Sequence, residues 1–185
     1  MTSATVIVLA SGRGERFIGS GGTGSKLQAL LGGKTVLQRT LAAVHASGLP
    51  WYLEESGQAG MADSIAAAVR STPDATGWLV LPGDLPLIQS QTLLDVAAAL
   101  QQHGVVLPSY RGQRGHPVGF ASDCRQSLLD LHGEQGAASV VRSRCAFEVL
   151  VDDAGCIFDI DTLDDLRRAE RTLLAASLAK TGEND

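Results

Sequence analysis

Several features are scarce in this sequence of 185 residues, and each scarcity excludes a class of protein. There are three cysteines (Cys124, Cys145 and Cys156), with no CxxC pair and no ligand-like cluster. This odd number argues against a disulfide framework or a zinc site and fits thiols in a reducing cytosol. No apolar run approaches the roughly 18 residues of a membrane span. Met1–Thr5 also lacks the basic segment of a signal peptide, so we expect a cytoplasmic protein without a membrane partner.

Positive charge is also scarce, because 15 Lys and Arg stand against 20 Asp and Glu, a formal net charge of −5. A chain of this charge is a poor candidate for general nucleic-acid binding, which depends on phosphate neutralisation. The 44% hydrophobic and 19% charged residues are ordinary for a globular protein and argue against wholesale disorder. At about 100–200 residues per domain, we expect one domain over residues 1–181 and a frayed end at 182–185.

What the sequence does contain is unevenly placed. Residues 1–40 carry five basic groups and one acid, whereas residues 147–185 carry ten acids and four bases. Glycine gathers beside the basic groups, and six of the 21 glycines fall within thirteen consecutive residues: Gly12, Gly14, Gly19, Gly21, Gly22 and Gly24. We therefore expect an anion to bind near the amino end of a net-negative protein.

Short apolar runs alternate along the chain with segments of helical spacing. Strands are predicted at Thr5–Ala10, Trp51–Leu53, Trp78–Leu81, Val105–Leu107, Pro117–Phe120 and Phe147–Val151. Helices are predicted near Lys34–Ser47, Asp63–Arg70, Ser90–Leu100, Cys124–Leu131, Ala137–Ser143 and Thr162–Leu178. Ser90 and Thr162 are the predicted N-caps of two of these helices, the second paired with Asp165. This alternation predicts an α/β domain with a mostly parallel sheet flanked by helices.

The glycine-rich segment fails two familiar tests for nucleotide loops. Gly19, Gly21 and Gly24 satisfy G-x-G-x-x-G, but they begin nine residues after the predicted strand ends, and no acid follows about 20 residues later. The order Gly24-Ser25-Lys26-Leu27 also departs from the G-K-[ST] of a P-loop. Neither the dinucleotide fold nor the P-loop is therefore predicted.

A strand followed by glycines and then cations still suits a polyphosphate. Backbone N–H groups can approach the phosphates at glycine, and Lys or Arg neutralises the charge. Gly12, Arg16 and Lys26 are the residues that we expect in this role. The residues Ile18–Gly24 remain open to two interpretations, a part of the phosphate site or a mobile surface loop without contacts, in which case Gly19–Gly24 would be a flexible lid.

Asp84 follows a predicted strand and the turn Pro82-Gly83. Its carboxylate is therefore expected at the carboxyl end of the sheet, where ligands of α/β proteins bind. A carboxylate in that place suits Mg²⁺, which takes one or two carboxylates together with phosphate oxygens. The alternative is that Asp84 only forms the turn.

The motif Leu9-Ala10-Ser11-Gly12, with Arg16-Phe17 and Lys26-Leu27 behind it, resembles the amino-terminal signature of the MobA-like nucleoside-triphosphate transferases. The closest branch looks like the molybdenum-cofactor cytidylyltransferases. Further segments match in the right order: Gly60-Met61-x-x-Ser64, Gly83-Asp84-x-Pro86, Gly115-His116-Pro117, Gly133-Glu134-Gln135-Gly136-Ala137 and Asp159-Ile160-Asp161-Thr162. The resemblance implies a Rossmann-like nucleotidyltransferase fold and an enzyme that joins a nucleotide to a phosphorylated acceptor and releases pyrophosphate.

The resemblance also assigns roles to individual residues. Arg16, Lys26 and Asp84 would be catalytic, and Mg²⁺ would be the cofactor, held by Asp84 and Asp161, with Asp159 as a candidate further ligand. Charge at a helix terminus is the alternative for the two later aspartates. The nucleotide would contact these residues: Leu9, Ala10, Ser11, Gly12, Lys26, Gly60 and Ser64. Met61, within the same segment, is as well explained as core.

Gly115 and His116 would bind the acceptor, the molybdenum cofactor, through its phosphate or its pterin. Arg111 and Arg114 are near in sequence and suit the same neighbourhood. Another phosphorylated acceptor, such as a sugar or an isoprenoid precursor, is the alternative within enzymes. The alternative outside enzymes is a non-catalytic cofactor carrier or maturation factor with a molybdoenzyme as its partner.

Three departures from the family pattern affect these expectations. Ser11 replaces the Ala of the cytidylyl branch and the Gly of the guanylyl branch, so it does not choose the base. The segment Asp159-Ile160-Asp161 looks like the cytidylyl branch and favours CTP over GTP. The phosphate loop is lengthened by Ile18 and Ser20–Ser25. The interval from Lys26 to Gly60 is short, so the sheet could lack one strand of the family and expose an edge.

Overall fold

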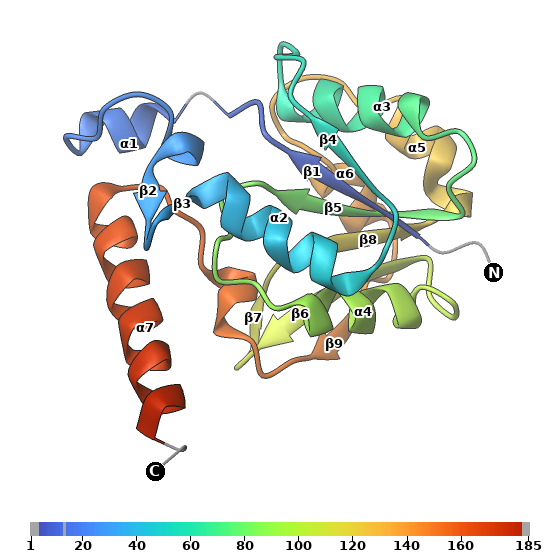
Figure 1. The fold of residues 1–185 in the computed structure, drawn as a ribbon. Helices are drawn as coiled ribbons and strands as arrows, with labels where there is room; N and C mark the ends of the chain where they lie inside the picture. Colours follow the sequence, from blue (N-terminus) through green and yellow to red (C-terminus); the bar gives the residue numbers. More distant parts are fainter. Residues whose placement is uncertain (1–3, 13, 183–185) are drawn as a thin grey trace.

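A computed structural model describes residues 4–12 and 14–182. They form an α/β domain around a seven-stranded sheet in the order β4-β1-β5-β8-β6-β7, with β9 paired to β6 (Figure 1). The strands are β1 Thr5–Leu9, β4 Trp51–Glu54, β5 Gly77–Pro82, β6 Val105–Tyr110, β7 Gln113–Arg114, β8 Val118–Ala121 and β9 Phe147–Leu150. β4, β1 and β5 are parallel, and β8 is antiparallel to both β5 and β6. Because β9 is parallel to β6, most strands share one direction, and the predicted fold class is confirmed.

Helices cover both faces of the sheet, as alternation along each strand requires. Val6 and Val8 of β1 face one hydrophobic cluster, whereas Ile7 and Leu9 face the other. The first cluster includes side chains of α2 and α4, and the second includes side chains of α3, α5 and α6. These helices are α2 Val36–Ser47, α3 Met61–Ser71, α4 Ser90–Ala99, α5 Arg125–Leu129 and α6 Ala138–Ser143. Both faces of β1 are buried, which explains its continuous apolar sequence.

Most predicted elements are present within a few residues of their expected ends. The pair Thr162 and Asp165 caps the last helix as predicted, since the Asp165 amide donates to Thr162 Oγ1 at 3.2 Å. Ser90 was not the cap: it is the first residue of α4, and Gln89 is the N-cap, its amide bonded to Asp153 Oδ2. The helix expected from Lys34 begins only at Val36, because Thr35 and Gln38 form a capping box there.

Several short elements were not predicted. They are α1 Glu15–Gly19, the 3₁₀ turns η1 Lys26–Gln28, η2 Ser122–Cys124 and η3 Ala154–Ile157, and the hairpin β2 Leu30–Leu31 with β3 Lys34–Thr35. The loop after α1 is docked, because Ser20 Oγ accepts from the Leu163 amide at 3.0 Å and donates to the Phe17 carbonyl at 2.8 Å. The interpretation of this segment as a loop without contacts is therefore wrong.

The short interval between Lys26 and Gly60 supplies η1, the hairpin, α2 and β4. β4 is the edge strand of the sheet, next to β1. The expectation that the family sheet has one strand more stays a prediction.

The final helix, α7 Leu163–Gly182, stands beside the hairpin and extends away from the sheet (Figure 1). Gly182 is helical, and the rest of the predicted frayed end, residues 183–185, lies outside the described residues. The extent of the single domain also stays a prediction. Within residues 4–12 and 14–182, no helix has both the length and the apolar character that crossing a membrane requires.

Candidate active site

A cleft of about 800 Å³ opens at the carboxyl ends of β1 and β5. Parallel strands end at the same edge of a sheet, so the loops that follow them meet there. The Gly83 amide donates to the Leu9 carbonyl at 2.9 Å, which joins the two loops. A Cβ at Gly83 would lie 3.0 Å from the same carbonyl oxygen, so the close approach explains the glycine. This turn places Asp84 in the cleft wall.

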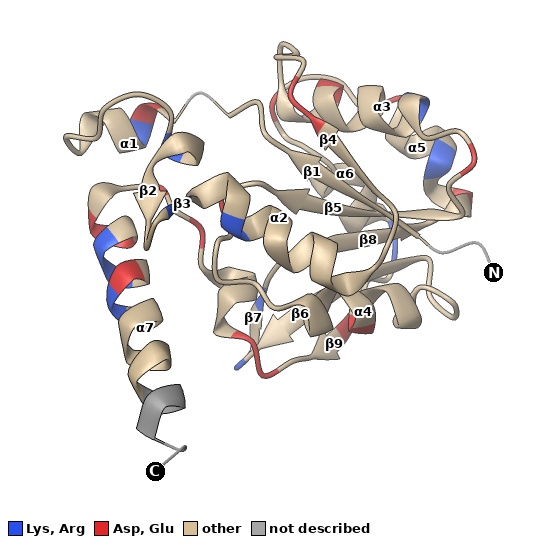
Figure 2. Ribbon diagram, in the orientation of Figure 1, with Lys and Arg blue, Asp and Glu red and all other residues tan. Residues whose placement is uncertain are grey.

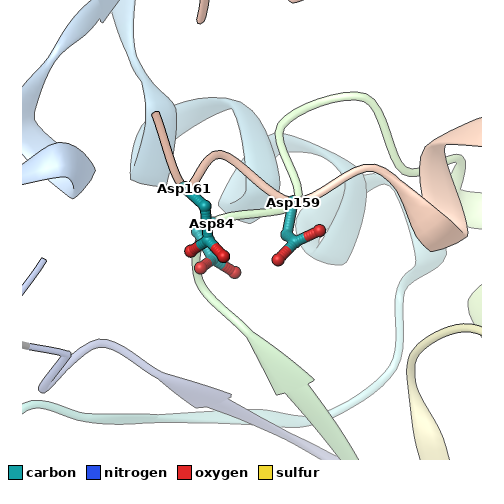
Figure 3. Close-up of side chains that lie close together, drawn as sticks. All are labelled: Asp84, Asp159 and Asp161. Carbon is teal, nitrogen blue, oxygen red and sulfur yellow. The ribbon is translucent and has the colours of Figure 1, made fainter. Parts of the chain in front are cut away.

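Three carboxylates meet in the cleft, from two segments far apart in sequence (Figure 3). Asp84 follows β5, and Asp159 and Asp161 lie between η3 and α7. Each offers a carboxylate oxygen within 4.8 Å of the others. Ile160 between them is fully buried, and its amide donates to the Asp84 carbonyl at 3.0 Å. The buried isoleucine therefore fixes this segment against the turn and leaves both neighbouring aspartates in the cleft.

The two predicted phosphate cations contact these carboxylates directly. Lys26 Nζ lies 2.7 Å from Asp84 Oδ2 and 2.8 Å from Asp161 Oδ1. Arg16 pairs with the other oxygen of Asp161 at 2.5 Å, although its own side chain is 79% exposed. In Figure 2, acidic and basic segments occur both on α1 and in the first turns of α7. The charge separation seen along the sequence is thus brought together in space.

The protonation of this cluster follows from burial and charge. Burial alone would lower the pKa of Lys26, but the nearby Asp84 and Asp161 outweigh it and raise that pKa, so Lys26 is a cation. Burial raises the pKa of Asp159, and the negative charges of Asp161 and Asp84 act in the same direction. Three acids therefore share two cations, and the cluster holds a surplus of negative charge when all three are ionised.

The residues present fit a divalent cation. Asp84 Oδ1 is buried and has no hydrogen-bond partner in the described part of the chain. Such an oxygen is costly to bury unless a proton donor or a cation meets it. Three hard oxygen ligands close together also suit Mg²⁺ or Mn²⁺ better than a soft metal.

At the other end of the cleft lie residues predicted to contact the nucleotide. Ser11 Oγ and Ser64 Oγ are 3.1 Å apart and hydrogen-bonded, so the loop after β1 is joined to α3. Gly60 is the N-cap of α3, and a Cβ there would overlap the carbonyl of Gly133. The lining includes these predicted residues: Leu9, Ser11, Gly12, Lys26, Gly60 and Ser64.

Ala10 is not among the residues that line the cleft. Its amide donates to the carbonyl of Glu54 at 2.8 Å, so its backbone continues the pairing of β1 with β4. The interpretation of Met61 as core is wrong, because its side chain is 48% exposed and lines the cleft.

Gly115 and His116 line the cleft on the side of β7 and β8. A Cβ at Gly115 would come within 2.5 Å of the Cys156 carbonyl oxygen, and the His116 amide donates to that oxygen at 2.8 Å. Burial lowers the pKa of His116, and the opposing charges of Asp84 and Asp159 are insufficient to restore it. The imidazole is therefore neutral at neutral pH, and its buried Nδ1 has no partner among the described residues.

Sequence reasoning missed several cleft residues. Gln58 and Glu134 line the cleft from the loops before α3 and α6. Glu134 belongs to the motif Gly133-Glu134-Gln135-Gly136-Ala137, but the sequence predicted no role for it. Arg114 also lines the cleft and pairs with Glu148 at 2.8 Å. Unlike Gln58 and Glu134, Arg114 was expected near the acceptor, because it lies two residues before His116. It belongs to β7, which follows the turn at Arg111 and Gly112, two residues with positive φ.

Fold and site together define an α/β domain of the nucleotide-binding class, with its cleft at the carboxyl ends of parallel strands. The chain belongs to the MobA-like NTP transferase family, because residues 40–149 match the MobA-like NTP transferase domain. It is 30% identical over 197 residues to a molybdenum cofactor guanylyltransferase of Cupriavidus taiwanensis, covering 90% of this chain and 96% of that relative.

A second relative is the bifunctional protein GlmU of Stenotrophomonas maltophilia, which is 32% identical over 108 residues. That alignment covers 57% of this chain but only 21% of GlmU, so the chain spans about a fifth of that relative. Rv0371c from Mycobacterium tuberculosis H37Rv has a similar structure, with a TM-score of 0.77, 27% identity and coverage of 92% of this chain and 98% of Rv0371c. Its structure as a complex with manganese gives a TM-score of 0.73 at 26% identity, with the same coverage.

The family is thus established, but the branch differs from the one that the motifs resemble. The Cupriavidus relative is named for guanylyl transfer, whereas the resemblance pointed to the cytidylyl branch.

Proposed function

We propose that this chain is a metal-dependent nucleotidyltransferase that joins a nucleotide to the phosphate of the molybdenum cofactor. An oxygen of the acceptor phosphate attacks the α-phosphorus of the triphosphate, the bond between the α- and β-phosphates breaks, and pyrophosphate leaves. The observation that carries the proposal is the contact of Lys26 with both Asp84 and Asp161 in the cleft of a MobA-like domain.

In-line displacement needs positioning and charge neutralisation, with no protein nucleophile. Lys26 is placed on a short 3₁₀ turn capped by the hydroxyl of Ser25, which accepts from the Leu27 amide at 3.3 Å. Its ammonium can move from the carboxylates to phosphate oxygens over a short distance, since both lie in one cleft. Arg16 is exposed and can fold onto the terminal phosphates from the cleft entrance.

Asp84, Asp159 and Asp161 would hold the divalent ion, for which we propose Mg²⁺. When bound there, the ion supplies positive charge against the phosphate oxygens on which negative charge develops. The orphaned Oδ1 of Asp84 supports this assignment, and the relative Rv0371c has a structure with manganese. Asp84 and Asp161 would then give up their contacts with Lys26, which frees the ammonium for the triphosphate.

The base is the finer part of the proposal. The name of the Cupriavidus relative, which aligns with 90% of this chain, favours GTP. The aspartate at position 161 favours CTP, by its resemblance to the cytidylyl branch. The hydroxyl groups of Ser11 and Ser64 can hydrogen-bond to either base, so they do not distinguish GTP from CTP.

The test is release of pyrophosphate from each of GTP, CTP, ATP and UTP, in Mg²⁺, with and without the isolated molybdenum cofactor. We expect release that needs both the cofactor and one of GTP or CTP. If pyrophosphate is released only with a different phosphorylated acceptor, such as a sugar phosphate or methylerythritol phosphate, the proposed nucleotidyl transfer stands and the proposed acceptor is wrong.

A non-catalytic carrier gives a different set of results. Calorimetry would then find tight binding of the cofactor and no affinity for GTP or CTP in Mg²⁺. That outcome, together with no pyrophosphate release from any pair, contradicts the proposed function.

A further inference from the structure

A second, smaller cavity of about 320 Å³ adjoins the cleft. The two share four lining residues, which are Leu9, Met61, Pro82 and His116. We call the smaller cavity the His116 pocket. It lies on the face of the sheet that α3, α5 and α6 cover, and its volume is at the lower end of the roughly 300–1,000 Å³ of small-molecule sites.

The His116 pocket differs chemically from the cleft. Its walls are apolar side chains of α3, β5, β8 and α6, including Ile65, Val80, Phe120 and Val141. The one charged side chain in its described lining is Arg142, which lies exposed on α6. A pocket of this kind binds an uncharged, flat group through dispersion and burial rather than a phosphate.

Two polar groups lie in this apolar lining. His116 Nδ1 is buried without a partner in the part of the chain that the structure describes, and Gln135 contributes an amide. Burial keeps His116 neutral, so it offers one hydrogen-bond donor and one acceptor and no charge. A neutral imidazole suits the amide-like edge of a heterocycle better than a phosphate dianion.

We propose that the His116 pocket binds the pterin ring of the acceptor, while the acceptor's phosphate extends into the cleft toward Asp84. The inference rests on the proposed function and adds to it the place and the chemistry of acceptor recognition. The nucleobase is the other flat group in the reaction. It is less suited, because Ser11, Gly60 and Ser64 line the cleft and not the pocket.

Ala138 is the position from which the pocket can be filled. It is the first residue of α6, it is exposed, and it lines the pocket. Ala138→Trp should therefore occupy the pocket without disturbing the core. Ser139→Trp is the matched control, since Ser139 is exposed on the same helix and is not part of the pocket lining.

The probe is 6-hydroxymethylpterin, a pterin without phosphate, whose binding to the full chain is followed by its fluorescence. We expect saturable binding to wild-type protein and to Ser139→Trp, and a Kd at least about tenfold higher for Ala138→Trp. His116→Phe, which keeps a flat ring but removes both nitrogens, should also weaken binding of the probe. Thermal unfolding of each variant shows that it is folded.

Binding of GTP and CTP in Mg²⁺ is measured on the same proteins and should be unchanged in Ala138→Trp. Equal Kd values for the pterin in wild type, Ala138→Trp and His116→Phe overturn the pocket assignment, whatever the pyrophosphate assay gives. Weakened nucleotide binding with unchanged pterin binding in Ala138→Trp would show that the base occupies the pocket, and it also overturns the assignment. If Ala138→Trp weakens pterin binding but the wild-type protein releases no pyrophosphate, the pocket assignment is supported and the proposed nucleotidyl transfer is contradicted.

Discussion

The charged part of the cleft, called here the cleft floor, consists of Arg16, Lys26, Asp84, Asp159 and Asp161. The His116 pocket adjoins the cleft and shares His116 with its lining, but its chemistry is the opposite of that of the floor. At the floor, Lys26 and Arg16 pair with Asp84 and Asp161, Asp159 offers an oxygen within 4.8 Å of theirs, and one carboxylate oxygen of Asp84 has no partner among the described residues. In the pocket, apolar side chains surround a neutral imidazole. One region is built for charge that arrives with its ligand, and the other is built for a ligand without charge.

The contrast shows how one fold can bind the charged and the flat, uncharged parts of its substrates in two adjoining sites. Charged groups in a partly buried cleft need partners of opposite charge, so under the proposed function the floor would exchange its ion pairs when metal and triphosphate bind. The apolar pocket needs no such exchange, because burial of the ligand is itself favourable. Changes to the floor should therefore act on turnover and metal, and changes to the pocket on acceptor binding.

The largest effect is expected from Asp84→Asn. This change keeps the shape of the side chain but removes the charge that meets the cation, so kcat/KM should fall by about 1,000-fold, the equivalent of about 4 kcal/mol. Steady-state pyrophosphate release measures it. Asp74→Asn, at an exposed aspartate that does not line the cleft, is the control and should behave as wild type. Full activity of Asp84→Asn would remove this residue from the metal site.

Lys26→Met should separate two roles of the floor. Loss of the ammonium should lower kcat/KM by about 100-fold, as loss of one charge-stabilising donor does in other enzymes. Without nucleotide, however, the same variant should bind Mn²⁺ more tightly than wild type, because Lys26 no longer competes for Asp84 and Asp161. Titration of Mn²⁺ measures the second effect. Weaker Mn²⁺ binding in the variant would contradict the exchange of partners.

Gly60→Ala tests the packing of the cleft wall, outside the His116 pocket, by its effect on stability. A Cβ there would overlap the Gly133 carbonyl, so the loop before α6 must shift, at a cost of about 1–3 kcal/mol in the free energy of unfolding. Urea unfolding measures it. Gly19→Ala is the matched control, since nothing lies within 4 Å of its Cβ position. Equal midpoints for the two variants would mean that Gly60 is not packed in this way.

The smallest effect concerns pH and His116. Because burial lowers the pKa of His116, the unfolded chain binds its proton more readily than the folded chain does. The stability that this group contributes is complete above about pH 6.5, its ordinary value, and is lost as the pH falls toward the folded pKa. Urea unfolding at several pH values between about 7.5 and 5 should show a smaller pH dependence for His116→Phe than for wild type. Parallel curves would mean that His116 is not buried as described.

Much of the fold was accessible from the sequence because the buried strands are continuous apolar runs. Thr5–Leu9 and Gly77–Pro82 lie at the centre of the sheet with both faces covered, and such strands stand out in any sequence. The hairpin β2–β3 and α1 were missed, because two-residue strands and a five-residue helix carry no periodicity. Their form depends on contacts with distant residues, such as that of Ser20 with Leu163.

The site was predictable in part, for a similar reason. Asp84 follows a strand and a turn, so its position at the sheet edge could be derived locally. The contact of Lys26 with Asp161 joins residues 135 positions apart, and nothing in the local sequence specifies it. The His116 pocket takes His116 and residues 135–137 from two of the quoted motifs, but its apolar walls on α3, β5, β8 and α6 come together only by packing, which the local sequence does not specify.

The central claim is that Asp84 and Asp161 form a metal site whose occupancy is coupled to the triphosphate. Its most direct test is Mn²⁺ binding followed by electron paramagnetic resonance, with and without GTP or CTP, in wild type, Asp84→Asn and Asp161→Asn. We expect one of the two triphosphates to tighten Mn²⁺ binding to the wild-type protein, and we expect each substitution to weaken Mn²⁺ binding at least about tenfold. Mn²⁺ affinities that are equal in all three proteins and unaffected by either triphosphate would contradict it.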